Sequence, residues 1–215
     1  MQRRKFLPTS FGDTTLGVFG SNKLQARGFA DTGWISFEIP KSTFGARVPR
    51  AQKLMSQLNC DLVIATPGTN FQYFVGYNPG RSERLIALLI PREGNPVIVS
   101  PSFEKERIFR RSTITDIDTW EEHESPYALV GMAAERLKVS SGNVGMEPTT
   151  NYIDYLKLKN ALSKANVQDG SPVFDELRMV KTTEELEAIR KAVEITVASI
   201  TATHQQLKDG LSEQE

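Results

Sequence analysis

The sequence predicts an α/β protein in which a mixed β-sheet is covered by helices on both faces. Short, β-branched apolar runs alternate along the chain with longer segments whose apolar residues recur at helical spacing. One pair of apolar runs is separated only by a tight turn at residues 92–95, which favours an antiparallel hairpin. Alternation of strands with helices favours parallel pairing elsewhere, so the sheet is expected to be mixed.

The first half of the body is expected to begin with a helix. Residues 47–58 place apolar side chains on one side of a helix: Val48, Ala51, Leu54, Met55 and Leu58. Strands are predicted at residues 60–66, 71–75, 85–90 and 96–99. Pro67-Gly68 ends the first of these runs and Gly76 ends the second, as turn residues do.

The second half is expected to be mostly helical. Residues 103–111 are predicted to be helical or irregular, and alternation in residues 114–120 predicts an edge strand. A helix is predicted from Pro126, with Ala128, Leu129, Met132, Ala133 and Leu137 on its apolar face. Residues 143–146 are predicted as a strand, followed by a helix to about Leu162 that Thr149 or Thr150 caps. Thr182 and Glu185 form a capping box for a last helix, whose stripe runs from Leu186 to Leu207.

The amino-acid composition excludes several classes of function for this protein. Lys and Arg number 26 and Asp and Glu also number 26 in 215 residues, so no net positive field favours nucleic acid or an anionic membrane. The lone Cys60 excludes an intrachain disulfide and a multi-cysteine zinc site. No run approaches the ~20 apolar residues of a membrane-spanning helix. We therefore expect neither nucleic-acid binding nor a membrane span.

The first 30 residues differ from the rest. Arg3-Arg4 precede a weakly apolar segment at residues 11–19, a pattern that resembles a twin-arginine export signal. Pro8 and Asp13 depart from that pattern, and a disordered basic tail is the alternative. The expected organisation is residues 1–30 as signal or tail, 31–172 as one domain and 173–215 as a linker with the first helix of another. Location is accordingly predicted as periplasmic or extracytoplasmic if the signal is real, and otherwise cytoplasmic.

Three segments in the same order resemble the amino-terminal domain of the aminopeptidase P, prolidase and creatinase family. The first is the helix at residues 50–55, which leads into the strand 60–65. The second is Gly68 to Tyr77, which is similar to the family segment Asn-x-x-Tyr-x-Thr-Gly-Phe/Tyr, with Val75 in place of the common Thr. The third is Glu176 to Lys181 with the helix that follows it, and the resemblance spans roughly residues 45–215.

The resemblance implies a creatinase/prolidase amino-terminal fold with a ribonuclease H-like motif. In these peptidases a following "pita-bread" domain holds two divalent metals (Mn, Co or Zn) with two Asp, one His and two Glu, and the metals activate the water that attacks the Xaa-Pro bond. None of the five ligands is expected in this chain, so it carries no cofactor of its own and is expected to be inactive alone. The segment ending at Glu215 looks like an interrupted chain. A proline-containing peptide substrate and a homodimer or homotetramer are the implied partners.

The polar loop at residues 77–84 supplies the candidate site residues. In this family such loops can project aromatic and Arg side chains toward a neighbouring subunit's active site. Tyr77, Arg81 and Arg84 are therefore predicted to contact substrate or a partner subunit, since the planar Arg fork binds a carboxylate through two hydrogen bonds. The alternative is a solvated loop without a binding role.

Two other functions remain compatible with the sequence. Creatinase shares the fold and hydrolyses a guanidino compound, so a creatinase-like amidinohydrolase domain is one alternative. The other is a peptide- or protein-binding module of a pseudo-peptidase, as in histone chaperones whose peptidase-like domain has lost its metals.

Overall fold

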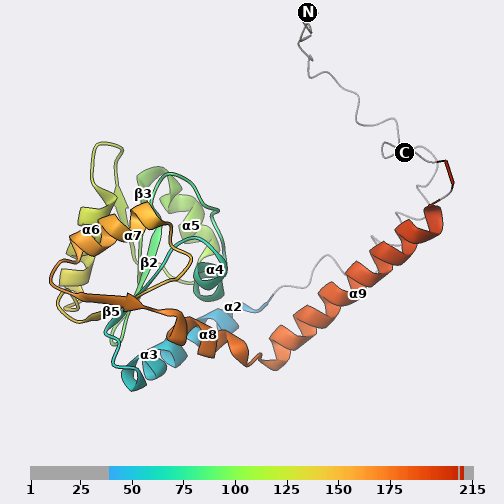
Figure 1. The fold of residues 1–215 in the computed structure, drawn as a ribbon, viewed down its shortest axis with the longest axis horizontal. Coiled ribbons are helices and arrows are strands. Elements are labelled where there is room, and N and C mark those ends of the chain that lie inside the picture. Colours follow the sequence, from blue (N-terminus) through green and yellow to red (C-terminus); the bar gives the residue numbers. More distant parts are fainter. Residues whose placement is uncertain (1–38, 208, 211–215) are drawn as a thin grey trace, which may run out of the picture. The chain divides into compact units, whose positions relative to one another are not determined.

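The computed structural model describes residues 39–207 and 209–210 of the chain. The predicted twin-arginine segment lies outside the described residues. The described part divides into a compact unit, Ile39–Thr183, and a second unit to which the residues from Glu184 onward belong. The helices and strands of the compact unit are α2 (Lys41–Gly45), α3 (Arg47–Gln57), β1 (Leu62–Ala65), α4 (Thr69–Val75), β2 (Ala87–Pro91), β3 (Val97–Pro101), the 3₁₀ helix η2 (Ser102–Glu104), α5 (Lys105–Arg111), β4 (Ile117–Trp120), α6 (Pro126–Arg136), β5 (Asn143–Met146), α7 (Tyr152–Ala161), β6 (Asn166–Asp169) and α8 (Ser171–Met179) (Figure 1).

The compact unit is built on a six-stranded mixed sheet in the order β4-β3-β2-β1-β5-β6. β1 pairs antiparallel with β2, and β2 pairs antiparallel with β3. The other pairs, β3–β4, β1–β5 and β5–β6, are parallel. Five strands therefore run in one direction and β2 alone runs in the other. The predicted mixed sheet and hairpin are confirmed, and the edge strand predicted at residues 114–120 is β4, which covers Ile117–Trp120.

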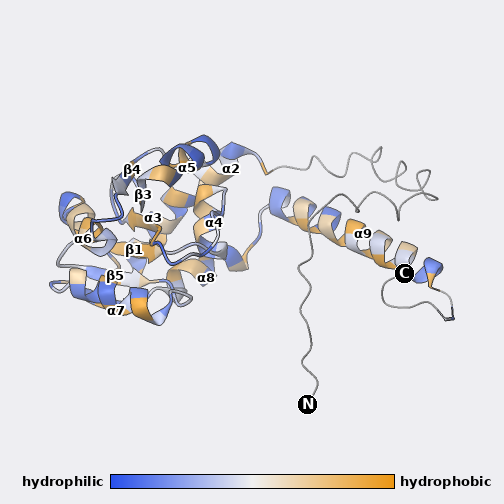
Figure 2. Cartoon of the chain, turned by 90° about the horizontal axis from the view of Figure 1, so that it is seen from above, coloured by the Kyte–Doolittle hydropathy of each residue, from blue (hydrophilic) through white to orange (hydrophobic). Residues whose placement is uncertain are grey.

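Helices cover both faces of this sheet, because successive side chains of a strand point to opposite faces. Val63 and Ala65 of β1 pack in one core with residues of α3, α4, α5 and α8, whereas Leu62 and Ile64 pack in the other core with residues of α6 and α7. In Figure 2 the region of β1 is in the hydrophobic colour, while helices such as α6 and α7 carry both colours. The predicted α/β class with helices on both faces is confirmed.

The prediction of a strand at residues 71–75 is wrong, since these residues form helix α4. Phe71, Phe74 and Val75 are completely buried at the i, i+3, i+4 spacing of a helix face. Gly76 ends the helix in the left-handed region, with φ of 79°, and its N–H donates to the carbonyl of Gln72. Aromatic residues favour strands in general, but here the helical spacing and the glycine at the end decide the structure.

Two details of α6 and α7 also differ from prediction. The buried face of α6 consists of Val130, Ala133 and Ala134, and the side chain of Met132 is 63% exposed, so Met132 does not belong to that face. The cap of α7 is Asn151, whose side chain accepts a hydrogen bond from the N–H of Asp154, and not Thr149 or Thr150. The two threonines instead lie in the turn between β5 and α7.

Three elements had no sequence prediction: the short helix α2, the strand β6 and the helix α8. β6 is a polar, mostly exposed edge strand, so it lacks the alternation that signals a strand. α8 begins directly after it with Pro172 in its first turn, and Val173, Phe174 and Leu177 are buried in the core shared with α3 and α4. The compact unit therefore continues to Thr183 and includes α8, beyond the boundary at residue 172 that the sequence suggested.

The last described helix, α9 (Thr183–Gln206), begins directly after Thr182, as predicted. Its apolar stripe is exposed in the described structure: Leu186, Ile189, Val193, Val197 and Ile200. Among the described residues, no helix is long and apolar enough to span a membrane.

Candidate functional site

The carboxyl ends of the parallel strands gather polar side chains at one edge of the sheet. Thr66 and Pro67 follow β1, Glu147 follows β5, and the loop that contains Arg81 and Arg84 leads into β2 at the same edge. In open α/β sheets, ligands bind outside the carboxyl ends of the strands. We call this region the carboxyl edge and treat it as the candidate site.

Glu147 is the centre of the hydrogen-bond network at the carboxyl edge. Its side chain is 2% exposed, yet both carboxylate oxygens accept hydrogen bonds. One oxygen accepts from the Thr66 N–H at 2.9 Å, and the other accepts from the Asn70 amide at 3.0 Å and the Thr149 hydroxyl at 2.9 Å. A buried carboxylate is tolerated only when such donors satisfy it.

Asn70 connects this carboxylate to helix α8. Asn70 is buried in the first turn of α4, and its side-chain oxygen accepts a hydrogen bond from Arg178 at 2.9 Å. Arg178 lies near the end of α8, 108 residues further along the chain. The network therefore joins the β1–α4 junction, the β5–α7 turn and α8.

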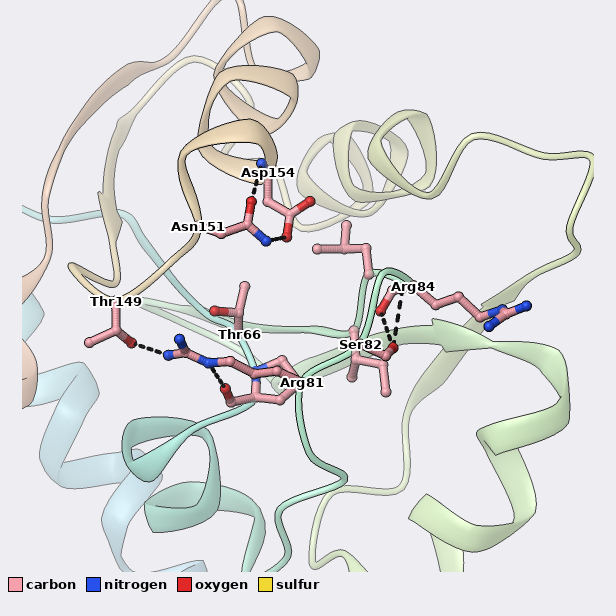
Figure 3. Close-up of a pocket in the computed structure, with 10 residues that line it drawn as sticks. Thr66, Arg81, Ser82, Arg84, Thr149, Asn151 and Asp154 are labelled. Atoms are coloured by element: carbon pink, nitrogen blue, oxygen red, sulfur yellow. Dashed lines mark hydrogen bonds between the residues drawn. The ribbon is translucent and has the colours of Figure 1, made fainter. Parts of the chain in front are cut away.

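Arg81 reaches the same network from the loop. Its Nε donates to the Pro67 carbonyl and its Nη2 to the Thr149 hydroxyl, each at 2.9 Å, as Figure 3 shows. The guanidinium lines a small pocket together with Thr66, Asn151 and Asp154. The cavity volume is about 30 Å³, which is room for about one water molecule.

Arg84 lines the same pocket, but its side chain points away from Arg81 (Figure 3). Its guanidinium pairs with Glu83 and with Glu122, the latter at 2.6 Å, and lies 5.6 Å from the exposed ring of Phe103. The hydrogen bond to Glu122 raises the pKa of Arg84 above its usual value. Arg84 is therefore part of a surface cluster beside the pocket.

Tyr77 lies in a separate cluster with helix α5. Its hydroxyl accepts a hydrogen bond from Arg107 at 2.6 Å, and its ring lies 5.1 Å from the Arg111 guanidinium. Arg107 also donates to the Pro79 carbonyl, so α5 fixes the start of the loop. The structure therefore places Arg81 in the pocket, Arg84 on its rim and Tyr77 at the far end of the loop.

Sequence reasoning did not identify Glu147, Asn70 or Arg178 as site residues. The only sign of this network in the sequence is the position of two of its residues at the ends of strands: Glu147 directly follows the predicted strand 143–146, and Thr66 ends the predicted strand 60–66. Polar residues that follow neighbouring parallel strands meet at one edge, but the sequence alone does not reveal that β1 and β5 are neighbours.

Tyr127 of α6 donates a hydrogen bond to Asp154, which lines the pocket, at 2.7 Å. Burial and then this hydrogen bond raise the pKa of Tyr127 well above its usual value near 10. Above pH 10 the unfolded chain loses this proton while the folded chain keeps it, so stability falls as the pH rises. We predict that the free energy of unfolding falls less steeply with pH in Tyr127→Phe, because the variant lacks the proton that the unfolded chain loses. The difference in slope corresponds to at most one proton per molecule.

Urea titrations between pH 8 and 11 measure this effect. Tyr152→Phe is the matched control, because Tyr152 is 70% exposed on α7, and it is expected to leave the pH dependence as it is in the original chain. Equal slopes for Tyr127→Phe and the original chain would contradict the assignment.

The described residues contain no group of three or more His, Cys, Asp or Glu side chains that could hold a metal ion. The two divalent metals that the resemblance implies are expected in the domain that follows, and no ligand for them is assigned among the described residues. No chemical step through a metal is assigned to these residues.

The sequence matches the family described as Creatinase/Prolidase N-terminal domain over residues 47–180. It is 28% identical over 172 residues to an uncharacterized peptidase of Staphylococcus aureus (strain bovine RF122 / ET3-1), covering 77% of this chain and 46% of that protein. The chain thus spans about half the length of the curated relatives it matches.

Two solved structures show where the fold is shared. The recombinant prolidase of Thermococcus sibiricus matches with a TM-score of 0.72 and 26% identity, over 80% of this chain and 47% of that one. The creatinase/prolidase N-terminal domain of an X-Pro dipeptidase from Streptococcus pyogenes matches with a TM-score of 0.53 and 17% identity, over 59% of this chain and 95% of that one. The second likeness concerns the fold alone.

Proposed function

The chain belongs to the creatinase/prolidase N-terminal domain family, and on that premise we propose that it is the scaffold and substrate-gating domain of a dimetal peptidase that cleaves Xaa-Pro bonds. The two metals, Mn, Co or Zn, would be bound by residues that follow Glu215. The whole protein would act on proline-containing peptides as a homodimer or homotetramer. The likeness to a prolidase at 26% identity supports this assignment.

The arrangement of Arg81 is the observation that carries the gating role. Two hydrogen bonds hold its guanidinium at the carboxyl edge, where its side chain is still exposed to solvent. A guanidinium presents paired N–H groups that match the two oxygens of a carboxylate. A short Xaa-Pro peptide has one free carboxylate, at the end opposite its amino group. We propose that Arg81 binds this carboxylate.

The test uses the chain lengthened by the coding sequence that follows Glu215, with Mn²⁺ present. We expect hydrolysis of an Xaa-Pro dipeptide, and in Arg81→Ala we expect KM to rise about tenfold or more with little change in kcat. A hydrogen bond to a charged group contributes about 1.5–3 kcal/mol, and 1.4 kcal/mol corresponds to a factor of ten. Such uniform binding affects KM rather than kcat.

Arg110→Ala is the matched control, because Arg110 is 74% exposed on α5 and pairs with Glu106 of its own helix. It is expected to leave KM unchanged. An unchanged KM in Arg81→Ala would overturn the role of Arg81. Hydrolysis of a guanidino compound in place of the dipeptide, or no hydrolysis at all, would overturn the peptidase assignment.

A further inference from the structure

The carboxyl edge contains a chain of hydrogen bonds whose direction is fixed. Arg81 can only donate, so the Thr149 hydroxyl that it contacts accepts this bond and donates its own proton elsewhere. The atom that receives the proton is a carboxylate oxygen of Glu147, at 2.9 Å. The order Arg81, Thr149, Glu147 therefore has one consistent donor–acceptor assignment.

The same logic fixes the other side of Glu147. Arg178 can only donate, so Asn70 presents its oxygen to Arg178 and its amide N–H to the carboxylate. The N–H of Thr66 is also a donor only. Glu147 thus accepts hydrogen bonds from the Thr66 N–H, the Asn70 amide and the Thr149 hydroxyl.

This chain determines how Arg81 is held. The guanidinium is fixed at two points, through Nε to Pro67 and through Nη2 to Thr149. Two hydrogen bonds to one planar group stop its rotation, whereas one bond alone permits rotation about the N–H axis. Among the described residues, Nη1 of Arg81 has no hydrogen-bond partner, so it remains free to donate to a ligand.

We infer that Thr149 and Glu147 are positioning residues for Arg81: they orient its guanidinium so that Nη1 and the free N–H of Nη2 are presented together to a ligand carboxylate. A donor pair that is oriented in advance loses less conformational entropy on binding. The carboxylate ligand rests on the proposed function, whereas the orientation of Arg81 can be measured in this chain without any activity.

The experiment compares Thr149→Val with Thr149→Ser. Valine has the shape of threonine without the hydroxyl, and serine keeps the hydroxyl. Thr149 is exposed, so neither change alters the core. The first readout is the hydrogen-exchange rate of the Arg81 Nε–H, measured by NMR in this chain and assigned through Arg81→Lys. We expect exchange to be about five- to tenfold faster in Thr149→Val and unchanged in Thr149→Ser.

The second readout is kinetic, in the lengthened chain. We expect Thr149→Val to raise KM for the dipeptide several-fold without lowering kcat, and Thr149→Ser to restore the original KM. Equal Nε–H exchange in Thr149→Val and the original chain would overturn the positioning role, whatever the activity. An unchanged KM in Arg81→Ala would instead overturn the proposed function, and the exchange rates would still decide whether Thr149 orients Arg81.

Discussion

Replacing Phe174 by alanine is expected to lower the free energy of unfolding of the compact unit by about 3–5 kcal/mol. Phe174 lies on α8, is 1% exposed, and packs edge-on against Phe74 of α4 with ring centroids 6.3 Å apart. Truncation removes this apolar contact and leaves a cavity between the helix and the sheet. Urea titration followed by circular dichroism measures the change.

Phe109→Ala is the control for this prediction, because the ring of Phe109 is 49% exposed on α5. It is expected to change the free energy of unfolding by roughly 0.5 kcal/mol or less, as surface substitutions usually do. A loss of the same small size in Phe174→Ala would mean that α8 is not part of the folded core in solution.

Replacing Glu147 is expected to have the second large effect. In Glu147→Gln the amide places an N–H group opposite either the Thr66 N–H or the Asn70 amide, both of which can only donate here, so one buried donor loses its acceptor at a cost of about 1–3 kcal/mol. Asn70 cannot rotate its amide to help, because Arg178 already donates to its oxygen. Glu147→Leu deprives both the Thr66 N–H and the Asn70 amide of their acceptor, so we expect roughly 2–6 kcal/mol.

The matched control for this series is Glu135→Gln, since the side chain of Glu135 is 61% exposed on α6. Glu135→Gln removes one exposed negative charge, and this change is expected to alter the free energy of unfolding by roughly 0.5 kcal/mol or less. If Glu147→Gln proved as stable as Glu135→Gln, the neighbours of Glu147 could not have the donor roles assigned to them.

The parts of the fold that could be predicted are those whose signal is local. The strands at residues 60–66 and 143–146 and the hairpin across residues 92–95 are marked by apolar runs and by turn residues next to them. Gly94 has φ of 98° in that turn, a conformation that glycine adopts without strain. The polar edge strand β6 has no such pattern, because only one of its four residues is even partly buried.

The residues of the candidate site also fall into those that the sequence identifies and those that it does not. Arg81 and Arg84 could be named from the sequence, since a polar loop between apolar runs is visible without a structure. Glu147 and Asn70 are 77 residues apart, and Arg178 is 108 residues from Asn70. These contacts depend on the order of strands in the sheet, which residue patterns do not state.

The position of β1 in the middle of the sheet has a consequence for the order of folding. On one side β1 pairs with β2, which follows soon after it in the chain. On the other side β1 pairs with β5, and that pairing includes a contact between Asp61 and Asn143, which are 82 residues apart. A contact over that distance closes a long loop, which slows its formation relative to the β2–β3 hairpin. During synthesis, one side of β1 therefore stays unpaired until β5 has left the ribosome. In that interval the apolar run of β1 has an unpaired edge, which exposes this segment of the nascent chain to aggregation.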